Sequence, residues 1–197
     1  MITFATDVDK VLKLGHPCRC PKCENSCNYG SGVLGDGDLQ RLAEFLEMSE
    51  EKVREECLEE IEKFNTKRLR PKIMRKDGKP YGKCIFYDNV NGCKVHPAKP
   101  LECKVAMGCK PYGEELIAWF DLKHFFNPND PESLRQLKVY IEAGGKLIPG
   151  AELENFADAD TLKKIQEYDD LKDDTDWPEV LGIKDILEKE GKNDERE

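Results

Sequence analysis

The chain holds nine cysteines among its 197 residues, and eight of them fall into two groups. The first group places four thiols between Cys18 and Cys27, and the second extends from Cys84 to Cys109. Thiolates are soft, charged ligands on short side chains, and four of them complete a tetrahedral zinc site or hold an iron–sulfur cluster. The sequence therefore predicts eight metal ligands: Cys18, Cys20, Cys23, Cys27, Cys84, Cys93, Cys103 and Cys109.

Disulfide bonds are the main alternative use of so many cysteines. An odd number of cysteines cannot pair completely within one chain. The first residues lack the apolar core of a secretory signal peptide, and no run approaches the roughly 18 apolar residues of a membrane span. We therefore expect a cytoplasmic protein without a membrane segment, a setting in which disulfides are rare and metal binding is favoured.

Charge is distributed unevenly along the chain. The net charge is −9, and residues 151–197 alone contain 17 acidic and 7 basic side chains. The cysteine-rich part is therefore nearly neutral. The acidic residues 151–197 are typical of exposed helical faces. The alternative is that they contact a basic partner or a basic segment of this chain.

One basic run leads directly into the second cysteine group. Residues 66–83 contain eight Lys and Arg side chains against one Asp. An anionic or nucleic-acid partner at residues 67–83 is one interpretation, and cations that offset the charge of nearby thiolates are another. An exposed strand or loop facing the acidic helix before it is preferred, because no aromatic residues are interleaved for base stacking.

Apolar residues at helical spacing predict several short helices. One spans residues 3–14, a second follows a capping residue at Asp36 or Asp38, and a third runs from Ser49 to Phe64. Each carries apolar side chains on one face only. Such helices bury their apolar stripe against a core and leave the other face in water.

Two local features refine this prediction. Cys57 lies on the apolar stripe of the third helix with Val53 and Ile61, so we expect a buried core thiol rather than a ninth ligand. Residues 85–87 predict a short strand, and the Asp, Asn and Gly residues between 88 and 92 supply turns.

The expected fold is mainly α. It consists of a small, loop-rich, metal-stabilised domain with short helices and room for one short β-hairpin, followed by a helical C-terminal region. We assign residues 1–112 to the cysteine-cluster domain, residues 113–190 to an acidic helical region that packs on it, and residues 191–197 to a disordered tail. Metal ligation would supply folding free energy that a modest apolar core lacks.

Spacing within the cysteine groups suggests how ligands are shared. Two residues separate Cys20 from Cys23, which suits a tight turn that aims both sulfurs at one ion. Cys18 and Cys20 are separated by one residue and point to opposite sides of an extended segment, so they serve different metals unless one bridges. His96 follows Cys93 at a ligand-like spacing. Because eight thiols already complete two four-ligand sites, a turn role or a hydrogen bond to a ligand is preferred for His96.

The order of these motifs resembles that of the YkgJ-type cysteine-cluster proteins, a family described as zinc- or iron-chelating. The resemblance covers roughly residues 15–110. It departs from the family pattern in lacking an adjacent Cys-Cys pair, in carrying Lys at both Arg positions of the second block, and in having His96 where the family has Tyr. The matching positions of the second block are Gly82, Cys84, Phe86, Cys93, Val95, Lys99, Pro100, Cys103 and Lys104.

The resemblance implies metal chelation and leaves the metal open between zinc and an iron–sulfur cluster. Some relatives look like lysine methylases and others have been called iron–sulfur oxidoreductases, so an iron–sulfur-dependent enzyme is one alternative. A zinc-stabilised binding module for an anionic or nucleic-acid partner is a second. The sequence leaves open whether the chain is an enzyme, because it lacks a nucleophile elbow, a His-Glu-x-x-His motif and a Walker loop. Gly30, Gly32 and Gly35 match G-x-G-x-x-G, but they follow a cysteine group instead of a buried strand.

Overall fold

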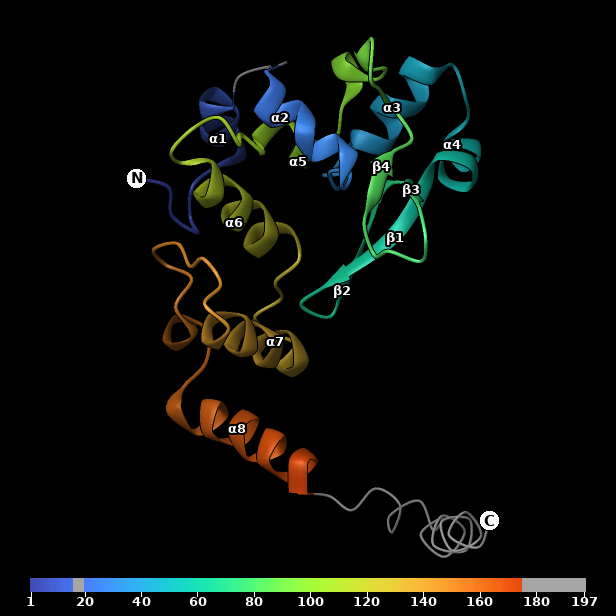
Figure 1. The fold of residues 1–197 in the computed structure, drawn as a ribbon. Helices are drawn as coiled ribbons and strands as arrows, with labels where there is room; N and C mark the ends of the chain where they lie inside the picture. Colours follow the sequence, from blue (N-terminus) through green and yellow to red (C-terminus); the bar gives the residue numbers. More distant parts are fainter. Residues whose placement is uncertain (16–19, 175–197) are drawn as a thin grey trace, which may run out of the picture. The chain divides into compact units, whose positions relative to one another are not determined.

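The computed structural model describes residues 1–15 and 20–174, which belong to two units (Figure 1). The first unit spans Met1–Phe156, and the second begins at Ala157 and contains helix α8 (Ala159–Asp174). The boundary expected after residue 112 falls inside the first unit. The tail expected at 191–197 lies outside the described residues.

Short helices form the N-terminal half of the first unit. They are α1 (Val8–Leu14), α2 (Pro21–Asn25), the 3-10 turn η1 (Ser26–Asn28), α3 (Asp38–Leu46) and α4 (Glu50–Cys57). The hydroxyl of Ser49 accepts the backbone N–H of Lys52 at 3.2 Å and caps α4, as the sequence predicts. Glu50 and Glu51 occupy the first turn, where the helix dipole favours negative charge.

The predicted helix from Ser49 to Phe64 is wrong in its second half. The helix ends at Cys57, and the chain continues as strand β1 (Leu58–Lys63), which pairs antiparallel with β2 (Thr66–Pro71). A two-residue turn joins the strands, and both of its residues, Phe64 and Asn65, have positive φ angles of 46° and 56°. This backbone matches the twist of a hairpin.

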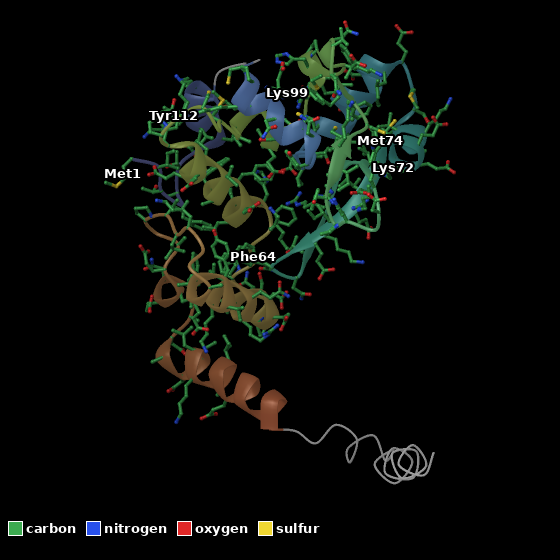
Figure 2. The ribbon with its side chains drawn as sticks, in the orientation of Figure 1. Met1, Phe64, Lys72, Met74, Lys99 and Tyr112 are labelled. Carbon is green, nitrogen blue, oxygen red and sulfur yellow. The ribbon has the colours of Figure 1, made fainter. Side chains whose placement is uncertain are left out.

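Contacts across and beyond the hairpin explain why a strand forms here. Glu59 lies opposite Arg70 in the register, and its carboxylate accepts from the Arg70 Nε at 2.9 Å. Phe64, labelled in Figure 2, lies at the turn. Its ring stands edge-on to the Tyr140 ring, with centroids 5.6 Å apart. Glu59, Arg70 and Tyr140 are distant in sequence from the residues they contact, so helical spacing within residues 49–64 could not reveal these interactions.

Two further hairpins correct the predicted fold class. Strand β3 (Ile73–Arg75) pairs with β4 (Gly82–Cys84), and β5 (Tyr87–Asp88) pairs with β6 (Gly92–Cys93), both antiparallel. The described part of the chain therefore contains three two-stranded sheets and mixes helix with strand. The expectation of a mainly α protein with at most one hairpin is wrong. The hairpin near residues 85–92 forms, with Asp88 Oδ1 accepting the backbone N–H groups of Val90 and Asn91.

The second half of the first unit is helical. After the turn η2 (His96–Ala98) come α5 (Leu101–Val105), α6 (Gly113–His124), α7 (Pro131–Glu142) and the turn η3 (Leu153–Asn155). Helix α6 packs on α5 and buries half of its twelve residues, including Trp119 and Phe120. The Trp119 Nε1 donates to the Thr6 carbonyl oxygen at 2.9 Å and ties α6 to the N-terminal segment.

Two apolar clusters frame the cysteine segments. One surrounds α3, α4 and the β-hairpins and includes Leu42, Val53, Leu58 and Phe86, together with the thiol of Cys84. The other is centred on α6. Among the residues that the structure describes, no helix combines the length and the apolar character needed to cross a bilayer.

Candidate metal centre

Three of the predicted ligands converge on one point. The sulfur atoms of Cys20, Cys23 and Cys109 all lie within 4.8 Å of one another. The Cys23 and Cys109 sulfurs are 3.6 Å apart although 86 residues separate them in sequence. An ion bound tetrahedrally at about 2.3 Å from each thiolate holds its ligand sulfurs about 3.8 Å apart. The spacing is therefore that of ligands around a single ion.

Helix α2 presents the first two of these sulfurs. Cys20 is the N-cap of α2 with an extended backbone, and Pro21 occupies the first helical position, where its missing N–H is not needed. The Cys20 carbonyl oxygen accepts the backbone N–H of Glu24 at 3.0 Å. Cys20 and Cys23 thus stand at the cap and on the first turn of one helix, which is the tight turn that their spacing predicts.

A turn after α5 delivers the third sulfur. The backbone N–H of Lys110 donates to the Met107 carbonyl oxygen at 2.9 Å, and the turn so closed contains Cys109. A second turn follows, in which the backbone N–H of Gly113 donates to the Lys110 carbonyl oxygen at 3.1 Å. Helix α6 begins at Gly113. Cys109 is therefore held by the connection between two packed helices, α5 and α6.

The remaining described ligands form a second group: Cys27, Cys84, Cys93 and Cys103. Their sulfurs are near enough for the negative charge of one thiolate to raise the pKa of another. Charges on Cys27 and Cys93 raise the pKa of Cys84. Charges on Cys27 and Cys84 raise the pKa of Cys103. Strand β4, which ends at Cys84, packs against η1, which carries Cys27. The seven predicted ligands that the structure describes therefore divide between two places, with Cys23 and Cys27 on successive turns of one short segment.

Burial governs the protonation of this second group. Burial raises the pKa of the Cys84 thiol to about 12, and the Cys27 and Cys93 thiolates add to that effect. Burial, followed by the negative charge of Glu102, also raises the pKa of Cys103. Backbone N–H groups lower these pKa values. Those of Phe86 and Tyr87 lower the pKa of Cys84, and that of Gly32 lowers the pKa of Cys103.

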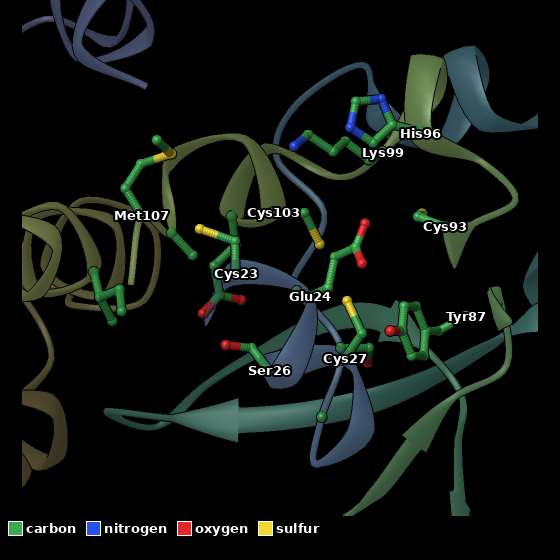
Figure 3. A pocket seen from close by; sticks show the side chains of 16 residues that line it. Cys23, Glu24, Ser26, Cys27, Tyr87, Cys93, His96, Lys99, Cys103 and Met107 are labelled. Atoms are coloured by element: carbon green, nitrogen blue, oxygen red, sulfur yellow. The ribbon is translucent and has the colours of Figure 1, made fainter. Parts of the chain in front are cut away.

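A cavity of about 250 Å³ adjoins the second group (Figure 3). Four cysteines line it: Cys27, Cys93 and Cys103 of the second group and Cys23 of the first. Figure 3 shows the sulfurs of Cys27 and Cys103 facing a common gap, which the Glu24 carboxylate also enters, whereas the Cys23 sulfur points away from that gap. His96, Lys99, Tyr87 and Glu102 complete the polar part of the lining.

Two carboxylates, the buried Asp38 and the partly buried Glu102, hold the wall that carries Cys103. Asp38, 2% exposed, accepts the backbone N–H of Gly35 at 2.8 Å and that of Leu101 at 2.5 Å. Glu102 accepts the backbone N–H of Val33 at 2.5 Å, and its burial raises its pKa. These hydrogen bonds fasten the glycine-containing segment 30–37 to α5.

The lining also shows what the sequence did not reveal. Glu24 and Glu102 were not predicted as site residues, although each lies next to a cysteine in the chain, a position that could have drawn attention to them.

His96 borders the cavity at the start of η2, and its role as a ligand or as a supporting residue stays a prediction. Cys18 lies outside the described residues. Cys57 belongs to neither group and packs half-buried against the apolar cluster, so it is less buried than the core thiol that the sequence predicts.

The basic run before Cys84 is largely engaged within the protein. Arg70 and Arg75 both pair with Glu59, with nitrogen–oxygen distances of 2.9 Å and 2.8 Å. Lys67 lies 3.4 Å from Glu60, and the Lys72 Nζ donates to a backbone carbonyl oxygen of α4 at 2.7 Å. The run therefore faces acidic residues, but these lie on strand β1 and not on the helix expected from the sequence. An anionic partner at residues 67–83 stays an untested prediction.

Comparison with known proteins finds no matching family model, no similar curated protein and no similar solved structure. The interpretation of the site therefore depends on its own geometry and chemistry.

Proposed function

We propose that the chain is a metal-chelating protein in which Cys20, Cys23 and Cys109 bind one divalent ion of the zinc type. The observation that carries the proposal is the convergence of three sulfurs from α2 and the α5–α6 connection within 4.8 Å. The resemblance of the cysteine motifs to the YkgJ-type proteins supports the same chemistry. Cys18 as a fourth ligand stays a prediction from the sequence.

The proposed ion has a structural role. None of the residues of α2 and η1, all of which are described, is buried, so apolar packing contributes little to holding this segment. A structural zinc ion contributes folding free energy directly, because the unfolded chain has no preformed site. The ion would fasten the N-terminal cysteine segment to the connection between α5 and α6.

The test is the metal content of matched cysteine variants. The wild-type protein, Cys109→Ser and Cys57→Ser are purified anaerobically and analysed for zinc. We expect Cys109→Ser to lose the zinc equivalent, whereas Cys57→Ser keeps it because Cys57 lies outside both groups. Cobalt(II) substitution provides a second measurement, since its visible spectrum reports thiolate ligation. Zinc that persists in Cys109→Ser at the wild-type level would overturn the proposal.

A further inference from the structure

The first cysteine group brings two thiols from distant segments within reach of each other. The Cys23 and Cys109 sulfurs are 3.6 Å apart, and the Cys20 sulfur lies within 4.8 Å of both. In a disulfide bond the two sulfurs lie about 2.05 Å apart, so the Cys23 and Cys109 sulfurs would have to approach by about 1.5 Å. Rotation of the two side chains covers a movement of this size without a change in the fold.

The backbones that carry these two thiols also lie close together. A Cβ atom added to Gly108 would lie 3.8 Å from the carbonyl oxygen of Lys22, and these residues are the chain neighbours of Cys109 and Cys23. A disulfide forms without strain only where the two backbones approach closely. The contact between α2 and the α5–α6 connection therefore favours a bond between Cys23 and Cys109.

A small oxidant has access to both thiols. Cys23 and Cys109 are each partly exposed, and Gly108 and Lys110 on either side of Cys109 are exposed. Cys23 also lines the cavity of about 250 Å³. Susceptibility of a cysteine to oxidation follows its exposure and its thiolate character. A metal ion binds sulfur as the thiolate, so the proposed zinc site keeps both sulfurs in the form that reacts with peroxides.

We propose that Cys23 and Cys109 form a redox-active pair, which hydrogen peroxide oxidises to a disulfide with release of the bound ion. This inference rests on the proposed zinc site and adds its regulation by an oxidant. One thiolate attacks a peroxide oxygen, the O–O bond breaks, and the sulfur becomes a sulfenic acid while hydroxide leaves. The second thiolate attacks the sulfenic sulfur, the S–S bond forms, and a second hydroxide leaves.

The step balances without a further reactant. The two sulfurs give up two electrons in total, hydrogen peroxide accepts both, and two protons from the solvent convert the two hydroxide ions to water. Of the three converging sulfurs, that of Cys20 alone then remains a thiolate, which is too few ligands to hold the ion. The disulfide replaces the ion as the link between α2 and the α5–α6 connection, so the oxidised protein keeps this part of its fold.

A bond between Cys20 and Cys23 is the competing product. Both residues belong to α2, one as its N-cap, so this bond would leave α2 without a link to the α5–α6 connection. Tryptic peptides distinguish the two products. Lys22 places Cys20 and Cys23 on different peptides, and Cys109 is the one cysteine on the peptide that follows Lys104.

The test follows zinc and disulfides together during oxidation. Zinc-loaded wild-type protein and Cys57→Ser receive a stoichiometric amount of hydrogen peroxide. A chromogenic chelator measures released zinc, and remaining thiols are alkylated before mass spectrometry of the non-reduced peptides, with fragment spectra to separate Cys23 from Cys27. We expect loss of the zinc equivalent together with a Cys23–Cys109 bond in both proteins, because Cys57 lies outside the group. Dithiothreitol and added zinc should restore the metal.

A second variant isolates the thiol pair from the metal. Cys20→Ser keeps Cys23 and Cys109, so after treatment with a chelator it should still form the Cys23–Cys109 bond with hydrogen peroxide. Circular dichroism before oxidation confirms that the metal-free variant is folded. A folded Cys20→Ser variant that forms no Cys23–Cys109 bond would overturn the pair.

The outcomes separate this inference from the proposed function. Zinc-bearing protein in which peroxide joins Cys20 to Cys23, or forms no disulfide, would overturn the redox pair and leave the zinc site standing. Protein that binds no zinc would refute the proposed function and the release of an ion. A Cys23–Cys109 bond formed in such protein would still support the thiol pair.

Discussion

The buried carboxylate of Asp38 accepts the backbone N–H of Leu101 at 2.5 Å, two residues before Cys103. The same oxygen accepts the N–H of Gly35 at 2.8 Å, and the other oxygen pairs with Arg41. One side chain therefore connects the glycine segment, α3 and α5. The position of Cys103 depends on this connection, because α5 is only five residues long.

Removal of this carboxylate should weaken both the fold and the cysteine site. Asp38→Ala leaves two buried N–H groups and Arg41 without their acceptor, and we expect the free energy of unfolding to fall by about 1–3 kcal/mol. Urea denaturation measures the loss, and metal analysis shows whether the second group is affected. Asp36→Ala is the matched control, because the Asp36 side chain is 93% exposed and pairs only at 3.5 Å with Arg68. Equal stability of the two variants would refute this role of Asp38.

The hairpin turn offers a second test. Phe64 is 7% exposed and packs edge-on against Tyr140 and against Phe126, whose centroid is 6.4 Å away. Phe64→Ala should lower the free energy of unfolding by about 3 kcal/mol, the cost of truncating a buried aromatic ring. Tyr81→Ala, which truncates a ring on a residue 45% exposed, should cost much less. A small effect of Phe64→Ala in thermal unfolding would mean that the hairpin does not depend on this packing.

Stability should fall on acidification, in part through Glu59. Hydrogen bonds from Arg75, aided by the positive charges of Arg70 and Arg75, lower the pKa of Glu59 below its ordinary value of 4.5. A group with a depressed pKa in the folded state stabilises the fold above its ordinary pKa, and this contribution is lost as pH falls through the folded value. Glu59→Gln should therefore lower stability at neutral pH and reduce the slope of stability against pH below 4.5.

Glu60→Gln provides the comparison for that experiment. The Glu60 side chain is 65% exposed and lies 3.4 Å from Lys67 at the surface. Exposed pairs contribute little to stability because water screens them. Urea denaturation at several pH values should give the Glu60→Gln variant the wild-type slope. An unchanged slope in Glu59→Gln would show that its pairing with arginine does not contribute to acid sensitivity.

The sequence predicted the chemistry of the site better than its arrangement. Thiol spacing correctly indicated a turn at Cys20 and Cys23 that points both sulfurs at one place. It could not indicate that Cys109, from the far side of α5, joins them while Cys103 does not. That division depends on the short helix α5, which carries Cys103 and precedes Cys109. Long-range hydrogen bonds, from Leu101 N–H to Asp38 and from Val33 N–H to Glu102, hold this helix in place.

The fold was predicted where local signals suffice. Helix α7 begins at a local signal, with Asp130 accepting the N–H of Glu132 at 3.1 Å and Pro131 in the first turn, where proline favours a helix start. Strand β1 was missed because Val53, Cys57 and Ile61 fit helical spacing equally well. Arginines from β2 and β3, which pair with Glu59, decide between the alternatives, and they act from beyond the segment itself.

The N-terminal cysteines of each group are separated by a long stretch of sequence from the cysteines that join them, and this affects when each group can form during synthesis of the chain. Cys20, Cys23 and Cys27 leave the ribosome long before Cys84, Cys103 and Cys109, which complete their two groups. Neither group can close before its later cysteines have been made, and until then the N-terminal cysteine segment, which has no buried residues, has little else to hold it in place. Metal capture would then have to wait for about the first half of the chain, and a truncated product ending before Cys84 would carry thiols without either complete site.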